Sequence, residues 1–308
     1  MKILVPEAMH PVSLQRLRAD HDVLHDPTLF TRRNELLEAA RDVDVIIVRN
    51  RTQVRDELLA ALASCRAVGR LGVGLDNIDV EGCRARGIKV IPAFGANARS
   101  VAEYVVTTVM LLLRRRHYGV SAGMAAGEWP RPPSPDGFEV EGRTLGLIGF
   151  GSIGQCTGRL AHRLDMRVVA YDPGFRGDMP TSFPCEMLPL EDLLASSDVV
   201  SLHLPLTPAT RGLIDASRLS LMRDGAVLVN AARGGIVDEA ALADALRQGK
   251  LHGAALDVFD TEPLPAGTVL TDVPNLLLTP HIAGVTADSE FRVCEYVADR
   301  ILELSPPR

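Results

Sequence analysis

Short apolar runs alternate with helical stretches along nearly the whole chain. Four runs in the first half and six in the second have the length and composition of strands. They span residues 3–5, 43–48, 67–71, 89–91, 144–148, 168–171, 199–202, 226–230, 253–256 and 276–278. Helical spacing separates the first four runs, at residues 12–17, 32–40 and 56–62. This alternation is typical of parallel sheets covered by helices on both faces, so we expect an α/β protein with two doubly wound units.

The clearest predicted helix runs from Ser100 to Arg116. Ser100 and Glu103 have the spacing of a capping box, in which each side chain satisfies a free backbone amide at the start of a helix. Apolar residues then recur around most of the helix, which is typical of a buried one. Residues 119–137 are rich in Gly and Pro, so an irregular arm is expected after the helix.

Composition and charge limit the classes of partner and binding site that are expected for the protein. Its 308 residues suffice for about two domains. The 33 basic residues minus the 39 acidic residues leave a net charge of −6, and aromatic residues make up 4% of the chain, so a nucleic-acid partner is not expected. The five cysteines are scattered without a C-x-x-C pair or a Cys/His cluster, so neither a metal site nor a disulfide framework is expected.

The apolar stretches and the first residues also indicate where in the cell the protein is expected. The longest of them, Val105 to Leu113, is far shorter than the ~20 residues that cross a bilayer. Residues 1–7 have the pattern of a first strand and not that of a signal peptide. We therefore expect a cytoplasmic protein with no membrane partner.

A glycine motif indicates a dinucleotide site. Gly149, Gly151 and Gly154 form G-x-G-x-x-G directly after the strand predicted at 144–148 and before a helical stretch, 155–164. In this context the first two glycines allow a tight turn and let a pyrophosphate approach backbone amides at the helix start. The third lets the helix pack close to the strand.

An acid follows the motif at the distance expected for ribose binding. Asp172 ends the next strand, 172 − 154 = 18 residues after the last glycine, against the ~20 that is typical. A carboxylate there accepts hydrogen bonds from ribose hydroxyls and repels a 2′-phosphate, which favours NAD over NADP. Arg176 lies nearby in the sequence and could weaken that discrimination.

Three polar residues follow predicted strands of the second half. Arg233 follows 226–230, Glu262 comes after 253–256, and His281 follows 276–278. Taken singly, such residues are more often surface ion pairs, loop charges or structural histidines. Together, beside a nicotinamide site, they suit hydride transfer to and from an alcohol carbon. A guanidinium binds a carboxylate and polarises a carbonyl, while an imidazole backed by a carboxylate exchanges the hydroxyl proton.

With these motifs the chain resembles the D-isomer-specific 2-hydroxy acid dehydrogenase family over essentially its whole length. The family's pattern also appears in residues 69–79, 97–103 and 203–207. The resemblance implies a Rossmann cofactor domain, residues 98–281, inserted in a flavodoxin-like substrate-binding domain made of residues 1–97 and 282–308. It also implies a homodimer.

The resemblance assigns roles to individual residues. It implies that Arg233, Glu262 and His281 are the catalytic set and that NAD is the cofactor. Residues expected to contact NAD are Gly149, Gly151, Ser152, Ile153, Gly154, Asp172, His203, Pro205, Thr210, Ala231, Arg233, Asp257 and His281, with Asp257 holding the nicotinamide carboxamide. Residues expected to bind substrate are Arg49, Arg51, Val73, Gly74, Asn97 and Arg233, with the amides around Val73 and Gly74 receiving the substrate carboxylate.

The sequence indicates the class of the 2-hydroxy acid but leaves its identity open. Arg49 and Arg51 resemble the phosphoglycerate dehydrogenase branch, in which a basic residue at this place faces a second anion of the substrate. Residues 92–97 depart from that branch's Asn-x-Pro-x-x-Asn, because Pro92 stands where the first Asn is usual. A phosphate or a sulfonate, as in 3-phosphoglycerate or sulfolactate, therefore stays open. The chain stops at Arg308 without the regulatory tail of many phosphoglycerate dehydrogenases, so control by serine is not expected.

Two alternatives stay open beside this interpretation, and a third is disfavoured. One is a glyoxylate or hydroxypyruvate reductase, whose substrates lack a second anion. Another is a dinucleotide-sensing corepressor, a class that retains the triad but acts mainly by binding. Formate dehydrogenases share the fold but carry a glutamine where Glu262 stands, which argues against formate as the substrate.

Overall fold

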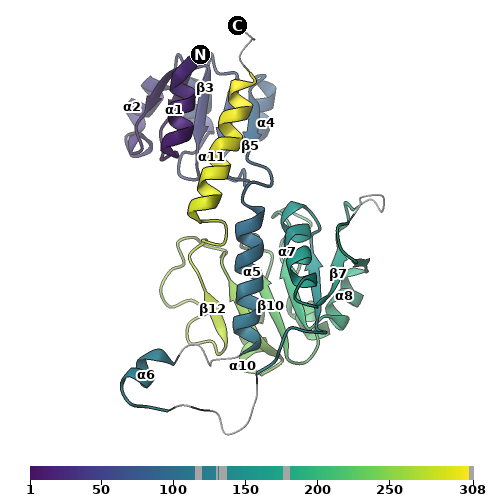
Figure 1. The fold of residues 1–308 in the computed structure, drawn as a ribbon. Helices are drawn as coiled ribbons and strands as arrows, with labels where there is room; N and C mark the ends of the chain where they lie inside the picture. Colours follow the sequence, from purple (N-terminus) through teal and green to yellow (C-terminus); the bar gives the residue numbers. More distant parts are fainter. Residues whose placement is uncertain (115–119, 130, 132–136, 176–180, 305–308) are drawn as a thin grey trace. The chain divides into compact units, whose positions relative to one another are not determined.

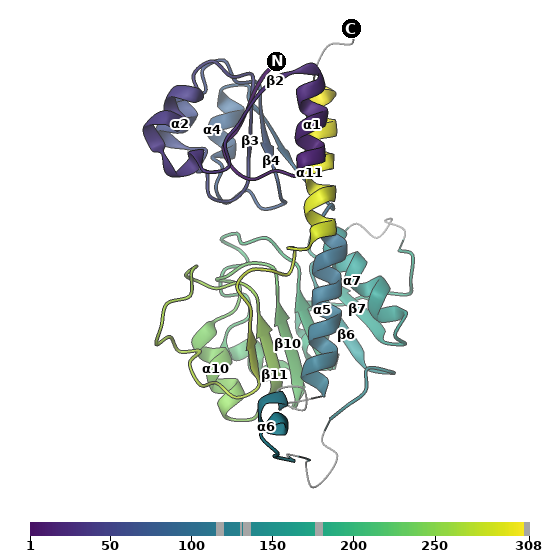
Figure 2. The ribbon, with the colours of Figure 1, turned by 60° about the vertical axis from the view of Figure 1, so that its left-hand side comes forward.

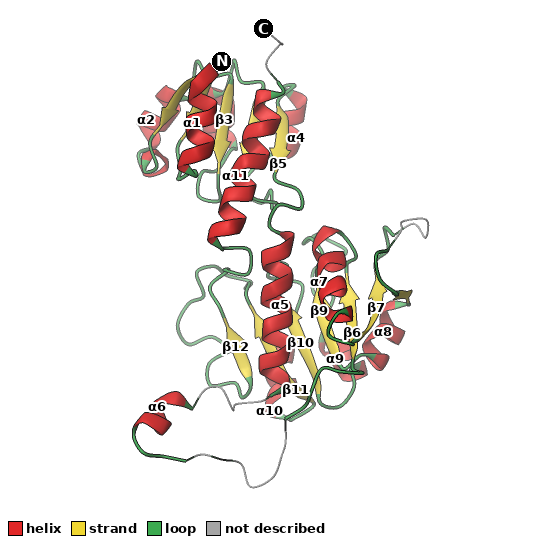
Figure 3. Cartoon of the chain, in the orientation of Figure 1, coloured by secondary structure: helices red, strands yellow, loops and turns green. Residues whose placement is uncertain are grey.

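The computed structural model describes residues 1–114, 120–129, 131, 137–175 and 181–304. The chain divides into two compact units, each built from a parallel sheet with helices on both faces (Figures 1 and 3). The first unit comprises Met1–Asn97 and Val285–Arg308, and the second comprises Ala98–Gly284.

The first unit has a five-stranded parallel sheet in the order β2-β1-β3-β4-β5. The strands are β1 (Lys2–Val5), β2 (Asp22–His25), β3 (Val45–Val48), β4 (Ala67–Arg70) and β5 (Lys89–Pro92). The helices are α1 (Pro11–Asp20), α2 (Arg33–Ala39), α3 (Asp56–Ala61), α4 (Val80–Ala85) and α11 (Ala287–Leu302), with a short 3₁₀ turn at Leu29–Thr31. This strand order is that of the flavodoxin-like fold.

Alternate residues of the central strands face two different cores. Ile3 and Ile47 pack under α1 and α11, which lie side by side in Figure 2. Leu4 and Ile46 point the other way, toward α2, α3 and α4. Because successive side chains of a strand point to opposite faces, a strand that is apolar throughout, such as β3, must be covered on both sides. The C-terminal helix α11 thus completes the sheet begun by the N-terminal residues.

The second unit has a seven-stranded parallel sheet in the order β12-β11-β10-β9-β6-β7-β8. The strands are β6 (Thr144–Ile148), β7 (Arg167–Tyr171), β8 (Glu186–Met187), β9 (Val199–Leu202), β10 (Ala226–Asn230), β11 (Leu251–Leu256) and β12 (Leu276–Leu278). The helices are α5 (Ala98–Leu113), α6 (Ser121–Ala125), α7 (Ser152–His162), α8 (Leu190–Ser196), α9 (Ala216–Leu221) and α10 (Glu239–Arg247). Taken from β6, this is the Rossmann order, with its switch point between β6 and β9.

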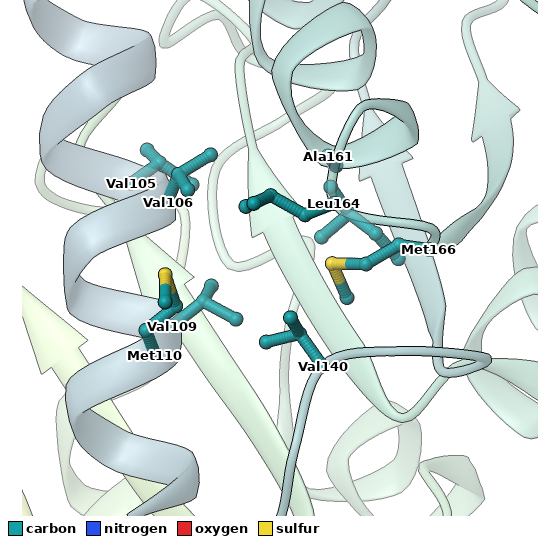
Figure 4. Close-up of a pocket in the computed structure, with 9 residues that line it drawn as sticks. Val105, Val106, Val109, Met110, Val140, Ala161, Leu164 and Met166 are labelled. Atoms are coloured by element: carbon teal, nitrogen blue, oxygen red, sulfur yellow. The ribbon is translucent and has the colours of Figure 1, made fainter.

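Helix α5 packs against α7, β10 and β11 on one face of this sheet. A small apolar pocket lies between α5 and the segment that follows α7 (Figure 4). It is lined by Val105, Val106, Val109, Met110, Val140, Leu145, Ala161, Leu164 and Met166. The other face of the sheet packs on α8, α9 and α10. The expected α/β class with two doubly wound sheets is therefore confirmed.

Local details differ from the sequence-based expectations. The prediction of a capping box at Ser100 and Glu103 is wrong, because α5 already begins at Ala98. The Glu103 carboxylate instead accepts a hydrogen bond from the Arg99 guanidinium at 2.5 Å. The arm predicted as irregular contains the short helix α6, while its residues 119, 130 and 132–136 lie outside the described part. Among the described helices, none is long and apolar enough to cross a membrane.

Candidate active site

The glycine motif forms the turn between β6 and α7. Gly149 has φ +100°, and a Cβ there would lie 2.6 Å from the carbonyl oxygen of His203. A Cβ on Gly154 would lie 2.3 Å from the carbonyl oxygen of Gly149. Gly151, by contrast, has open space where its Cβ would be, and it directly precedes α7, whose start has no capping side chain. An uncapped helix start facing open space is the arrangement that binds a pyrophosphate, so the motif fits NAD.

Asp172 lies at the carboxyl end of β7 and contacts the glycine turn. Its Oδ2 accepts from the Phe150 amide at 2.7 Å, and its Oδ1 accepts from the Gly174 amide at 2.8 Å. A carboxylate has about four acceptor positions, so two are left for the hydroxyls of a ribose. Arg176 lies outside the described residues.

The role proposed for Asp172 predicts a change in coenzyme preference. In Asp172→Ala, the ratio of kcat/KM for NADH to that for NADPH is expected to fall about 10–100-fold, because charge-assisted hydrogen bonds to the ribose and the repulsion of a 2′-phosphate are both lost. Initial rates with the two coenzymes give the ratio. Asp172→Asn, which keeps one acceptor oxygen, should lie between the alanine variant and the wild type. An unchanged ratio in Asp172→Ala would remove Asp172 from the ribose site.

The loop after β9 holds His203, Pro205 and Thr210. The Thr210 hydroxyl donates to the Pro205 carbonyl at 2.7 Å and accepts from the Thr207 amide at 2.8 Å, which closes the loop. The Ser201 hydroxyl lies 3.0 Å from Nε2 of His203. Desolvation lowers the pKa of His203 to about 4. The ring is therefore neutral near pH 7, and it contributes a hydrogen-bonding surface beside the glycine turn instead of a charge.

Arg233 stands on a tight loop after β10. The buried Asn230 side chain closes this loop: its Nδ2 donates to the Arg233 carbonyl at 2.9 Å, and its Oδ1 accepts from the Ala232 amide at 3.1 Å. Ala231 lies within the loop and is half-buried. A Cβ on Gly234 would lie 1.8 Å from the carbonyl oxygen of Phe259. Only glycine allows this approach, which holds the Arg233 loop against the loop that carries Glu262.

Glu262 and His281 form a hydrogen-bonded pair. The Nδ1 of His281 lies 2.8 Å from Oε2 of Glu262, while the other oxygen, Oε1, accepts from the Phe259 amide at 3.1 Å. The carboxylate is thereby oriented by its own loop and in turn orients the imidazole. Because Nδ1 is engaged, Nε2 is the ring nitrogen left to exchange a proton with a ligand. The side chain of His281 is 53% exposed and that of Glu262 is 37% exposed, so both are accessible to a ligand.

Asp257 is buried at the end of β11, behind the loop that carries His281. Its carboxylate accepts from the Thr279 hydroxyl at 2.6 Å and from the Ile282 and Ala283 amides at 2.8 Å each. Three of about four acceptor positions are therefore used within the protein. The carboxylate is first of all a support for this loop, with one position left for the nicotinamide carboxamide that the family resemblance assigns to it.

The predicted substrate residues Arg49 and Arg51 belong to the first unit, on the loop after β3. Two buried side chains hold this loop. Glu7 accepts from the amides of Arg49, Arg51 and Thr52 at 2.8, 3.1 and 3.0 Å, and Asn77 donates to the carbonyls of Arg49 and Thr52 at 3.0 and 2.7 Å. With its backbone held on both sides, the loop has a defined conformation.

The two arginines of this loop have different surroundings. Arg49 pairs with Glu290 at 2.7 Å and is partly buried. Arg51 is exposed, its guanidinium lies 5.5 Å from the centre of the Phe30 ring, and it forms no ion pair with any residue the structure describes. Contact with the ring face restrains Arg51 without neutralising it.

The other predicted substrate residues also have unused polar groups. Val73 and Gly74, on the loop after β4, are partly exposed, and within the described residues their amides donate no hydrogen bond. Such paired free amides suit a carboxylate. Oδ1 of Asn97 is buried and has no hydrogen-bond partner in the part of the chain that the structure covers.

Sequence reasoning missed the residues that support these loops: Glu7, Asn77, Asn230 and Gly234. One signal was available, since Glu7 follows β1 closely and Asn77 ends the glycine-rich segment after β4, both places where polar groups gather in open parallel sheets. The partners of Glu7 and Asn77 lie 25 to 45 residues away in the sequence, so the pairing itself could not be inferred.

Comparison with known proteins agrees with this geometry. The family model described as "D-isomer specific 2-hydroxyacid dehydrogenase, NAD binding domain" matches residues 107–283. The (S)-sulfolactate dehydrogenase of Chromohalobacter salexigens is 48% identical over 300 residues, which cover 97% of this chain and 96% of that protein. The D-3-phosphoglycerate dehydrogenase of Archaeoglobus fulgidus is 36% identical over 305 residues, but this chain spans only 57% of its length.

Solved structures show the same architecture. The TT0316 protein from Thermus thermophilus superposes with a TM-score of 0.86 at 35% identity, over 98% of this chain and 96% of that one. The family model covers more than half of the chain, and the sulfolactate dehydrogenase matches nearly all of it. The predictions of family and of NAD as cofactor are confirmed. The chain belongs to the D-isomer specific 2-hydroxyacid dehydrogenase family and is an NAD-dependent oxidoreductase of 2-hydroxy acids.

Proposed function

We propose that the substrate is a small 2-hydroxy acid with a second anionic group, and that this acid is sulfolactate, oxidised reversibly to sulfopyruvate. The observation that carries the proposal is the loop of Arg49 and Arg51. Glu7 and Asn77 hold its backbone, and Arg51 stays exposed and unneutralised among the described residues. A fixed guanidinium of this kind suits a sulfonate or phosphate oxygen.

Two observations favour a sulfonate over a phosphate. The sulfolactate dehydrogenase relative is 48% identical and matches over 96% of its length, whereas the phosphoglycerate dehydrogenase relative is 36% identical and matches over 57% of its length. Pro92 also replaces the first Asn of the segment that is usual in the phosphoglycerate branch. 3-Phosphoglycerate is therefore the second candidate.

The roles proposed at the reacting centre follow from the Glu262–His281 pair. NADH, when bound, supplies the hydride that reaches C2 of the 2-oxo acid. His281, protonated and oriented through Nδ1 by Glu262, donates the Nε2 proton to the carbonyl oxygen, and in the reverse direction it takes that proton back. Arg233 binds the α-carboxylate and polarises the carbonyl.

A substrate screen combined with one variant tests the proposal. NADH consumption is measured with sulfopyruvate, phosphohydroxypyruvate, hydroxypyruvate, glyoxylate and pyruvate, and sulfopyruvate is expected to give the highest kcat/KM. In Arg51→Ala, kcat/KM for sulfopyruvate should fall about 10–100-fold, because a charge-assisted interaction with the second anion is lost. Glyoxylate has no second anion, so its kcat/KM should stay within about twofold.

Arg33→Ala is the matched control, since Arg33 is an exposed arginine of the same unit that pairs with Glu57 instead. This variant should match the wild type with every substrate. Equal losses for sulfopyruvate and glyoxylate in Arg51→Ala would contradict the second-anion role. A preference for phosphohydroxypyruvate in the wild type would replace sulfolactate with 3-phosphoglycerate.

Two further parts belong to the proposal: assembly as a homodimer, which the family resemblance implies, and location in the cytoplasm. Sedimentation velocity measures the first, because a dimer has twice the 33.2 kDa mass of the chain.

A further inference from the structure

The loop that carries His281 is held by five hydrogen bonds to the end of β11. The Thr279 amide donates to the Leu256 carbonyl at 3.1 Å, and the His281 amide donates to the Asp257 carbonyl at 2.8 Å. The Asp257 carboxylate accepts three further hydrogen bonds from Thr279, Ile282 and Ala283. Asp257 is 1% exposed, so water cannot replace these bonds.

His281 itself needs such support. Its φ is +56°, in the left-handed region that residues with a Cβ adopt rarely. A conformation of this kind persists only where the surroundings impose it, and it recurs at functional sites. The backbone at His281 determines where its imidazole lies. Whatever fixes the backbone therefore also fixes the position of Nε2.

A second layer of contacts reaches Asp257 from helix α5. The Thr279 hydroxyl donates to Asp257, so its oxygen is free to accept, and the Tyr104 hydroxyl lies 2.6 Å from it. Tyr104 must then be the donor of that bond. Desolvation raises the pKa of Tyr104 above its usual value, which keeps the phenol protonated and able to donate. The hydroxyls thus form a directed chain from Tyr104 through Thr279 to the carboxylate, and consecutive bonds of one direction strengthen one another.

Helix α5 is a suitable anchor for this chain. It has 16 residues, its buried side includes Val101, Val105 and Thr108, and it packs against α7, β10 and β11. Tyr104 is only partly exposed on this helix. The loop at His281 is therefore tied to a long, well-packed element through two hydroxyl groups, and neither has a place in the reaction described above.

We propose that Tyr104 and Thr279 are positioning residues for the reaction, which act through Asp257 to hold His281 where Nε2 meets the substrate oxygen. The inference rests on the proposed function, because it takes His281 as the proton donor. Neither hydroxyl exchanges a proton with substrate. Their role is to keep the Asp257 carboxylate oriented, so that Ile282 and Ala283 retain their acceptors and the His281 backbone keeps its left-handed conformation.

Removing the hydroxyl at Thr279 is the central test. Thr279→Val keeps the shape of the side chain and is expected to lower kcat about 10-fold, with KM for NADH changed less than twofold. The substrate is the 2-oxo acid with the highest kcat/KM in the screen described above. Thr279→Ser restores the hydroxyl and should recover most of the wild-type kcat. Tyr104→Phe should lower kcat less, about threefold, because Thr279 still reaches Asp257.

The double variant separates a connected chain from two independent effects. Because Tyr104 acts only through Thr279, adding Tyr104→Phe to Thr279→Val should lower kcat no further. Thr144→Val is the matched control: Thr144 is also a buried threonine of this unit, but it lies at the amino end of β6, away from the loops of the site. Its kcat should equal that of the wild type. If the fold-decrease in kcat of the double variant equalled the product of the two single decreases, the two hydroxyls would act independently, which would contradict a connected hydroxyl chain.

Two readouts distinguish positioning from a general loss of stability. The solvent deuterium isotope effect on kcat should rise in Thr279→Val, because misplacing the imidazole slows proton transfer in particular. In protein labelled with ¹⁵N-histidine, the ring signals of His281 should shift or broaden in Thr279→Val and return in Thr279→Ser, without substrate present. A Thr279→Val enzyme with the kcat, isotope effect and ring signals of the wild type would overturn the inference. If His281→Ala also retained activity, the proposed function would fail separately.

Discussion

The His281→Ala enzyme is expected to reduce 2-oxo acids with a kcat lower by about 10²–10⁴, the usual loss when a positioned acid–base group is removed. The physical reason is the arrangement around Nδ1. Glu262 accepts the hydrogen bond of that nitrogen at 2.8 Å and orients the ring, so Nε2 is the nitrogen left to donate a proton to the substrate. Without the imidazole, the developing alkoxide must take its proton from water, which is a weaker acid and is not held in place.

Steady-state rates with saturating NADH measure the effect, and coenzyme binding is followed in the same variant by the change in NADH fluorescence. The dissociation constant for NADH should change far less than kcat, because His281 is one of many residues expected to contact NAD, and the glycine motif and Asp172 are unchanged in this variant. Glu262→Gln is the graded comparison, since the amide preserves a hydrogen bond to the ring but not the charge. The decrease in kcat should be smaller in Glu262→Gln than in His281→Ala. Turnover in His281→Ala near the wild-type level would exclude His281 as the proton donor.

The fold was predictable because its signals are local and repeated. The continuous apolar runs of β3 and β6 are buried throughout, as expected for strands covered on both faces. Short edge elements were missed, such as β2, whose residues alternate between exposed and partly buried, and β8, which has two residues. The capping-box prediction failed because Ser100 already lies inside α5, so its spacing to Glu103 reflected the helix repeat and not a helix start.

The site was predictable to the extent that it depends on strand ends. Arg233, Glu262 and His281 follow neighbouring strands, and parallel strands bring their carboxyl ends to one edge of the sheet. What holds these residues was not predictable, since it depends on distant contacts. The approach of Gly234 to Phe259 and the hydroxyl chain from Tyr104 to Asp257 join segments 22 to 175 residues apart. In the sequence such residues look like ordinary loop or helix positions.

Arg233 carries the second large prediction. In Arg233→Ala, kcat/KM for the 2-oxo acid is expected to fall by roughly 10²–10³, with both a higher KM and a lower kcat. A higher KM follows from the loss of hydrogen bonds to the α-carboxylate, which exist in the bound ground state. A lower kcat follows from the loss of the positive charge beside the carbonyl oxygen, where negative charge grows during hydride transfer.

Arg233→Lys separates these two contributions. Lysine keeps the charge but lacks the planar fork of donors, so it should recover part of kcat while KM stays high. Arg167→Ala serves as the control, because Arg167 is an exposed arginine of the same unit that pairs with Glu186. The Asn230 side chain bonds the Arg233 backbone, so truncating Arg233 keeps this closure of the loop and removes the hydrogen bond that the guanidinium donates to the Ala232 carbonyl at 2.6 Å. An effect confined to NADH affinity would assign Arg233 to the coenzyme and leave the substrate carboxylate without its main cation.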